Sequence, residues 1–198
     1  YERWDLNNAQ IKRALDYVRS QQEEDGSWYG RWGVNYIYGT WQVLRGMRAL
    51  NLDMKQPWLV KGGNWLESVQ HQDGGWGERC NTYDDPVYKG QGPSTASQTA
   101  WAVMGLCAFD NPDLPSLKRG VEYLIRTQNQ DGSWAEDETT GTGFPRVFYL
   151  KYDIYRNAWP LLALATYRKL LEKATAEKVN GASSVLSEST LQLAGTAR

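Results

Sequence analysis

The sequence predicts an all-α protein: an α/α toroid of alternating inner and outer helices, of which this chain forms about half of a twelve-helix barrel. Two observations support this prediction. One amphipathic-helix pattern occurs three times and always ends in the same turn. A helix that is apolar on nearly every side follows each copy. Because an all-round apolar helix is buried on all sides, the amphipathic helices must form a layer outside it.

The repeated pattern is a basic residue, a small residue, an aromatic–aliphatic pair, and then Gln, Gly and Trp at fixed offsets. The copies are Arg13-Ala14-x-x-Tyr17-Val18-x-x-x-Gln22-x-x-x-Gly26-x-Trp28, Lys61-Gly62-x-x-Trp65-Leu66-x-x-x-Gln70-x-x-x-Gly74-x-Trp76 and Arg119-Gly120-x-x-Tyr123-Leu124-x-x-x-Gln128-x-x-x-Gly132-x-Trp134. Three copies that agree at seven positions indicate a structural repeat.

Each copy begins as a helix and ends in a turn. Leu117, Val121 and Leu124 of the third copy recur at helical spacing and form one apolar face. Each copy then reaches an Asp-Gly pair, which favours a reversal of the chain. We expect the Gln amide to stack on the Trp indole and to hydrogen-bond backbone groups freed at a helix end.

Three helices of the second kind are predicted, over Tyr36–Leu50, Ser97–Phe109 and Asn157–Leu171. We expect all three to be buried on all sides. Pro160 lies near the start of the last one and is tolerated there if Asn157 is the N-cap.

Residues 1–173 are therefore predicted to be one part of the barrel domain. Residues 174–198 are rich in Ala, Ser and Thr and contain no aromatic residue, so we predict a frayed or disordered tail. Because Tyr1 leads directly into a helical pattern, we expect the chain to be a piece of a longer protein.

Composition excludes several classes of protein. The formal net charge is −1 and the chain has no basic stripe, which argues against nucleic-acid binding. Cys80 and Cys107 lie outside any C-x-x-C spacing, so we expect no disulfide framework and a reducing compartment. No apolar run is long enough to cross a bilayer, so we expect any membrane contact to be monotopic.

The repeat resembles the QW motif, the signature of squalene–hopene and oxidosqualene cyclases. Two further stretches, Gly30–Thr40 and Gly141–Leu150, are similar to the bacterial squalene–hopene branch, as are Tyr155-Arg156 and Pro160–Leu164. The similarity runs from about Ile11 to Leu170.

This resemblance implies two α-helical domains around a central cavity. It implies an enzyme that cyclises squalene through carbocations to hopene or hopanol, in hopanoid biosynthesis, with no metal or organic cofactor. It also implies a monotopic protein on the cytoplasmic side of the bacterial inner membrane, often a homodimer.

The resemblance also assigns roles to particular residues. The cavity aromatics that stabilise cations correspond to Trp32, Tyr38, Phe144, Phe148, Tyr152 and Tyr155. The residues of the QW motifs, with a structural role, are Gln22, Trp28, Gln70, Trp76, Gln128 and Trp134. An aromatic face stabilises a cation by about 0.5–2 kcal/mol without trapping it as a nucleophile would.

One departure from the family pattern is important. The family protonates squalene with a D-x-D-D acid, and this chain contains no such motif. We therefore expect the chain to be inactive by itself.

Other functions remain open. A terpenoid- or lipid-binding module would keep the aromatic cavity without a catalytic acid. A protein prenyltransferase β-subunit would need Asp, Cys and His around zinc, and the one histidine, His71, lies in a turn. A glycosidase would need two facing carboxylates. The acidic clusters between the helices are Asp84-Asp85 and Glu136-Asp137-Glu138, and Asp84-Asp85 favours solvated turn chemistry. Cys107 is predicted to be buried and inert.

Overall fold

The computed structural model describes residues 6–195, with side chains up to residue 179. In this range it contains helices α1 (Ala9–Ser20), α2 (Tyr36–Ala49), α3 (Pro57–Ser68), α4 (Ala96–Cys107), α5 (Pro115–Thr127) and α6 (Tyr155–Gly195), two short 3-10 helices, η1 (Cys80–Tyr83) and η2 (Pro86–Tyr88), and strands β1 (Gly141–Phe144) and β2 (Phe148–Leu150). The fold is mostly helical, as predicted. The small antiparallel hairpin of β1 and β2 was not predicted.

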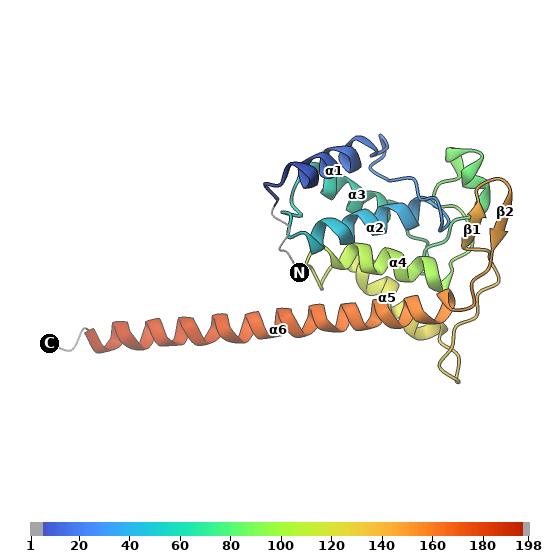
Figure 1. Ribbon diagram of the computed structural model, residues 1–198. Coiled ribbons are helices and arrows are strands. Elements are labelled where there is room, and N and C mark those ends of the chain that lie inside the picture. Colours follow the sequence, from blue (N-terminus) through green and yellow to red (C-terminus); the bar gives the residue numbers. More distant parts are fainter. Residues whose placement is uncertain (1–5, 196–198) are drawn as a thin grey trace.

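The helices alternate between two rows. α4 lies between α2 and α6, and α3 and α5 pack on the same central helix from the outer row (Figure 1). Every residue of α4 is buried, as an all-round apolar helix requires. That expectation is wrong for α2 and α6, which keep exposed sides; on α6, Leu161 and Leu162 are exposed. These two helices lie at the ends of the inner row, so each has an inner neighbour on one side only within the described range.

The end of the chain also differs from the prediction. α6 begins at Tyr155 and continues as a helix to Gly195, across most of the segment predicted to be a tail. The prediction that Asn157 is the N-cap is wrong, because Asn157 lies inside the helix. Its side-chain oxygen instead accepts a hydrogen bond of 3.1 Å from the backbone N–H of Trp134. Beyond the packed part, α6 extends away from the rest of the chain (Figure 1).

The repeated turns share one set of hydrogen bonds. The indole N–H of each repeat Trp donates to a carbonyl in the last turn of the preceding outer helix: Trp28 to Val18 at 2.8 Å, Trp76 to Leu66 at 2.7 Å and Trp134 to Leu124 at 2.8 Å. Carbonyls in the last turn of a helix lack the N–H donor four residues on that the rest of the helix supplies. The indole, rather than the Gln amide, therefore satisfies the end of its own helix.

The Gln amide has other partners. In every copy it donates to the carbonyl of the turn glycine, as Gln22 does to Gly26 at 2.9 Å. Gln22 also donates to the carbonyl of Trp58 at 2.7 Å, and Gln70 to that of Ser116 at 2.8 Å. Trp58 and Ser116 lie in the first turns of α3 and α5. The amides of Gln22 and Gln70 thus each join one outer helix to the next.

A buried glutamate follows two of the repeat Trp residues by two positions and caps an inner helix. Glu78 accepts from the backbone N–H groups of Ile37 at 3.0 Å and Asn35 at 3.3 Å, at the start of α2. Glu136 accepts from the N–H and hydroxyl of Ser97, at the start of α4. A carboxylate at a helix N-terminus satisfies free N–H groups and offsets the positive end of the helix dipole. Burial raises the pKa of both glutamates, although the hydrogen bonds oppose this shift.

The three glutamines should differ in their contribution to stability. Gln70→Ala removes the hydrogen bonds to its own turn and to α5, and it should lower the free energy of unfolding by about 1–3 kcal/mol. Gln128→Ala removes only the bond within its own turn and should cost less than about 1 kcal/mol. Urea unfolding of both variants tests this difference, and equal losses would contradict it.

Replacing Glu78 should also change the pH dependence of stability. The pKa of Glu78 is raised above its ordinary 4.5 by burial, so the folded state holds this proton more tightly than the unfolded state. The contribution of Glu78 to the free energy of unfolding is therefore full below about pH 4.5 and is lost as the pH rises through the raised pKa. Glu78→Gln keeps an acceptor oxygen and does not titrate, so it should lose less stability than the parent as the pH rises above 4.5. Thermal unfolding at a series of pH values measures this difference. Asp137→Asn, at a fully exposed carboxylate, is the control. Parallel stability profiles for Glu78→Gln and the parent would contradict the prediction.

Candidate functional site

Three segments meet where α2, α4 and α6 begin. The loop before α2 pairs with the strand β1: the Val34 N–H donates to the Thr140 carbonyl, and the Thr142 N–H donates to the Trp32 carbonyl, both at 3.0 Å. The hairpin lies at this amino-terminal end of the inner row (Figure 1). The two stretches that resemble the bacterial cyclases, far apart in the sequence, are therefore neighbours.

The structure brings three of the predicted site residues into one exposed group. The rings of Trp32 and Phe144 lie 6.3 Å apart and those of Phe144 and Phe148 lie 5.9 Å apart, each pair edge to face. Their exposed fractions are 50%, 53% and 45%. The guanidinium of Arg31 lies 5.2 Å from the centre of the Trp32 ring, so this aromatic face already accepts a cation.

The other predicted residues form a second group. Tyr152 and Tyr155 are 4.7 Å apart, and Trp101 joins Tyr155 (5.9 Å) to Tyr38 (5.0 Å). Burial raises the pKa of Tyr38 and Tyr155, and the phenol of Tyr152 raises both further. These phenols are therefore neutral near pH 7 and do not act as anionic nucleophiles.

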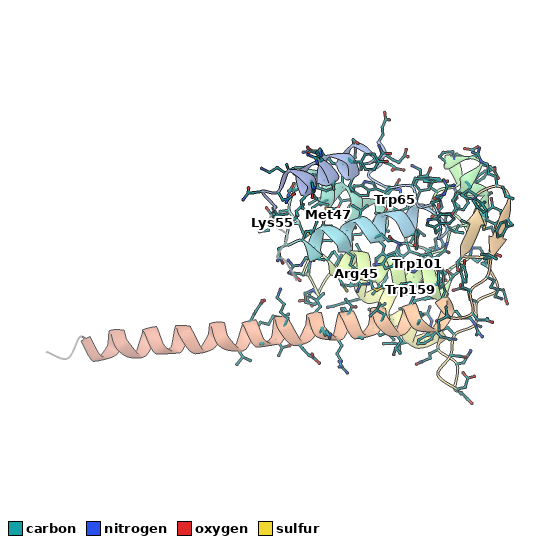
Figure 2. The ribbon with its side chains drawn as sticks, viewed as in Figure 1. Arg45, Met47, Lys55, Trp65, Trp101 and Trp159 are labelled. Carbon is teal, nitrogen blue, oxygen red and sulfur yellow. The ribbon has the colours of Figure 1, made fainter. Side chains whose placement is uncertain are left out.

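Three tryptophans of this second group were not predicted. Trp41, Trp101 and Trp159 each lie in the second turn of an inner helix, α2, α4 and α6. Trp41 stacks on Trp101 at 5.9 Å, and Trp159 meets Trp41 edge to face at 5.2 Å. Figure 2 shows Trp101 and Trp159 on the neighbouring helices α4 and α6. A Trp in the second turn of each inner helix is the sequence signal that could have identified them.

The indole N–H groups of these three tryptophans have no acceptor within the described part of the chain. An unpaired buried donor costs about 1–3 kcal/mol. The cluster thus presents aromatic surface and donors, with few lone pairs to react with an electrophile.

Glycines allow the site rings to lie against the backbone. A Cβ atom on each of three glycines would lie within 2.4 Å of an aromatic ring atom. The pairs are Gly33 with Tyr38, Gly141 with Tyr152, and Gly143 with Phe148. Any side chain at these glycines would displace a ring of the site.

The aromatics line open hollows rather than one closed cavity. Trp32 and Tyr38 line a hollow of about 450 Å³ beside α1. Phe144 lines another of about 460 Å³, beside Tyr83 and Arg146. The described residues therefore form a wall with two hollows, and the enclosed cavity that the resemblance implies needs further structure around it.

The acidic clusters have structural roles. The exposed Asp84 pairs with Arg146 at 3.2 Å, and Asp85 caps η2 through the Val87 N–H at 2.9 Å. Glu136 differs from the exposed Asp137 because it is buried against the start of α4. The His71 ring lies between the Ser94 hydroxyl at 2.9 Å and the Gly90 carbonyl at 3.1 Å. The prediction of turn chemistry at Asp84-Asp85 is confirmed, whereas Glu136 is a buried helix cap.

Neither cysteine forms a disulfide. Burial raises the pKa of Cys80 to about 11 and that of Cys107 to about 12, so both are thiols near neutral pH. Among the residues that the structure describes, no three His, Cys, Asp or Glu side chains are placed to hold a metal ion. No helix in the same range is long and apolar enough to span a membrane.

Known proteins are similar to this chain over most of its length. The family described as the squalene-hopene cyclase C-terminal domain matches residues 2–169. The squalene–hopene cyclase of Bradyrhizobium diazoefficiens is 53% identical over 162 residues, which cover 81% of this chain and 24% of that protein. The enzyme of Alicyclobacillus acidocaldarius is 49% identical, over 82% of this chain and 26% of its own length. A dammaradiene synthase of Dryopteris crassirhizoma is 46% identical over the same shares of the two chains.

Solved structures share the fold at low sequence identity. An ent-copalyl diphosphate synthase from Streptomyces platensis has a TM-score of 0.58 and 20% identity, over 80% of this chain and 28% of that one. A type II terpene cyclase from Scytonema, in complex with the substrate geranylgeranyl dihydroxybenzoate, has a TM-score of 0.59 and 18% identity, over 80% and 50% of the two chains.

The chain spans about a quarter of the length of these curated relatives. The family match over residues 2–169 includes the three repeat turns, the aromatic site and the start of α6. The chain therefore belongs to the squalene–hopene cyclase family and matches the C-terminal domain of that family.

Proposed function

We propose that this chain is half of the α/α barrel of a class II triterpene cyclase and forms part of its cavity wall. In the complete enzyme, squalene is cyclised through carbocations to hopene or hopanol, with no metal or organic cofactor. The main support is that both aromatic groups lie near the amino ends of the three inner helices, where Trp32 of one group and Tyr38 of the other line the same hollow. Family membership supports the same chemistry.

The aromatic wall is suited to carbocations for a physical reason. The negative face of an aromatic ring attracts a cation, and the attraction exceeds about 2 kcal/mol where water is excluded. Phe144 and Phe148 carry no lone pair that would trap the cation. The burial of Tyr38 and Tyr155 keeps their phenols neutral. Such a wall stabilises charge as it moves along the closing rings.

The acid that begins the reaction is proposed to come from another part of the enzyme. The sequence contains no D-x-D-D motif.

We also propose that the complete enzyme is a homodimer and that it attaches monotopically to the cytoplasmic side of the bacterial inner membrane.

A second candidate is a terpenoid- or lipid-binding module. It is favoured by one observation: the aromatic groups are present while the D-x-D-D acid is absent from the sequence. A binding module would bind squalene without converting it, whether or not further protein is supplied.

Phe144→Ala in a complete cyclase that carries this segment should shift products toward incompletely cyclised species. Loss of about 1–2 kcal/mol of cation stabilisation corresponds to about a 5–30-fold change in partitioning at the affected step. Gas chromatography of the products measures it. Val87→Ala, on η2 and 63% exposed, is the control and should leave the product ratios unchanged. Unchanged ratios in Phe144→Ala would remove this residue from the site.

The purified chain should not convert squalene. It lacks the proton donor, so incubation with squalene should give no cyclised product under conditions in which a full-length relative is active. Hopene formed by this chain alone would show that another acid starts the reaction.

A further inference from the structure

The tip of the β1–β2 hairpin carries a residue that the turn itself does not favour. Pro145, Arg146 and Val147 connect Phe144 to Phe148, and the Val147 N–H donates to the Phe144 carbonyl at 3.0 Å. Pro at the second position of such a turn and a positive φ at the third are typical of a type II turn, whose third position favours Gly. Arg146 holds this position with φ of +68°. The turn therefore carries backbone strain that a glycine would avoid.

The side chain of Arg146 makes a contact that offsets this strain. Its Nε and Nη2 atoms both donate to the backbone carbonyl of Tyr83, at 2.9 and 2.6 Å. Asp84 lies 3.2 Å from the same guanidinium, but the two charged side chains are 64% and 63% exposed, so this ion pair contributes little. The charge-assisted hydrogen bonds to the carbonyl are the stronger contact. They join the hairpin tip to the end of η1.

Tyr83 extends this connection to the loop of Trp32. Its ring is buried and stacks on Tyr149 of β2, with ring centres 5.8 Å apart. Its hydroxyl donates to the Gly33 carbonyl at 2.8 Å, and the Arg31 carbonyl lies 3.3 Å away. These two carbonyls flank Trp32. One residue of η1 therefore holds both the hairpin and the loop that carry the exposed rings of the site.

The exposed ring group, which is Trp32, Phe144 and Phe148, has little other support. The three side chains are 45–53% exposed, so packing alone constrains them weakly. Phe144 and Phe148 flank the turn directly, and a shift of the turn would change the 6.3 Å separation between the rings of Trp32 and Phe144. Misplacement by about 1 Å is enough to impair a site that depends on orientation.

We propose that Arg146 and Tyr83 are positioning residues, which hold the exposed ring group in place through the hydrogen bonds of Arg146 to the Tyr83 carbonyl and of the Tyr83 hydroxyl to Gly33. The guanidinium is itself positive, so it is unsuited to stabilising a carbocation and acts through the rings. The consequence for the reaction rests on the proposed function, whereas the ring geometry does not.

Fluorine NMR of the 198-residue chain tests the geometry. The sequence contains only three Phe residues, so labelling with para-fluorophenylalanine gives three signals. Phe109, whose ring lies against Gly63 and away from the hairpin, is the internal control. Arg146→Gly suits the left-handed turn and removes only the side-chain contact, so the chain should fold as before. The signals of Phe144 and Phe148 should move toward the chemical shift of the free amino acid, and that of Phe109 should not.

Tyr83→Phe tests the second hydrogen bond. It removes the hydroxyl that donates to Gly33 and leaves the ring and the backbone carbonyl in place. Only the loop of Trp32 loses its contact, so the signal of Phe144, whose ring meets Trp32, should move and that of Phe148 should change less. An unchanged Phe144 signal would overturn the role of Tyr83.

The same variants in a complete cyclase that carries this segment connect the geometry to the reaction. Arg146→Gly should shift the products toward incompletely cyclised species by about 2–10-fold, in the same direction as Phe144→Ala but less far. Arg146→Lys keeps a donor for the Tyr83 carbonyl and should restore part of the parent ratio. Lys151→Ala, which removes a positive charge directly after β2 that pairs with Asp137 at 3.7 Å, is the control and should leave the ratios unchanged.

The results distinguish a failure of this proposal from a failure of the proposed function. Unchanged signals of Phe144 and Phe148 in Arg146→Gly would overturn the positioning role, whatever the products. A product shift in Phe144→Ala with none in Arg146→Gly would also overturn it. Moved signals with unchanged products in both variants would support the positioning of the rings and contradict the cation-stabilising role proposed for Phe144.

Discussion

The fold depends on one contact: the hydrogen bond from the indole N–H of each repeat Trp to the last turn of the preceding outer helix. It fixes the turn against the helix, and the turn brings the Gln amide to the start of the next outer helix. It also fixes the chain two residues later, where Glu78 and Glu136 reach the starts of α2 and α4. The inner helices, and with them the loops that carry the site, are positioned by this sequence of contacts.

The same contacts affect the electrostatic environment of the site. The positive ends of the α2 and α4 dipoles lie at the end of the inner row where the aromatics gather, and they would disfavour a cation there. Glu78 and Glu136 accept hydrogen bonds from the free N–H groups at these ends, and the aromatic rings add their own negative faces. Structural residues of the repeat therefore contribute to the environment of the chemistry, even though they do not touch the proposed substrate.

Sequence periodicity predicted the helices well, because amphipathic and all-round apolar segments differ strongly in burial. It missed the β1–β2 hairpin, whose pairing with the distant loop at Gly33 is a tertiary contact. Glu78 was missed because a lone carboxylate in a Gly-rich loop normally lies in solvent. The roles of Trp32, Phe144 and the other site residues came from the family resemblance. The structure then showed which of them touch and added Trp41, Trp101 and Trp159.

The most direct test of whether this wall stabilises positive charge is a binding comparison with the 198-residue chain. A long-chain trimethylammonium ligand and its neutral tert-butyl isostere are titrated separately, with Trp fluorescence as the readout. We expect the cation to bind about 2–5-fold more tightly, and the difference to disappear in Trp32→Leu combined with Phe144→Leu. Equal affinities of the two ligands for the parent chain would contradict a cation-stabilising role for these aromatic residues.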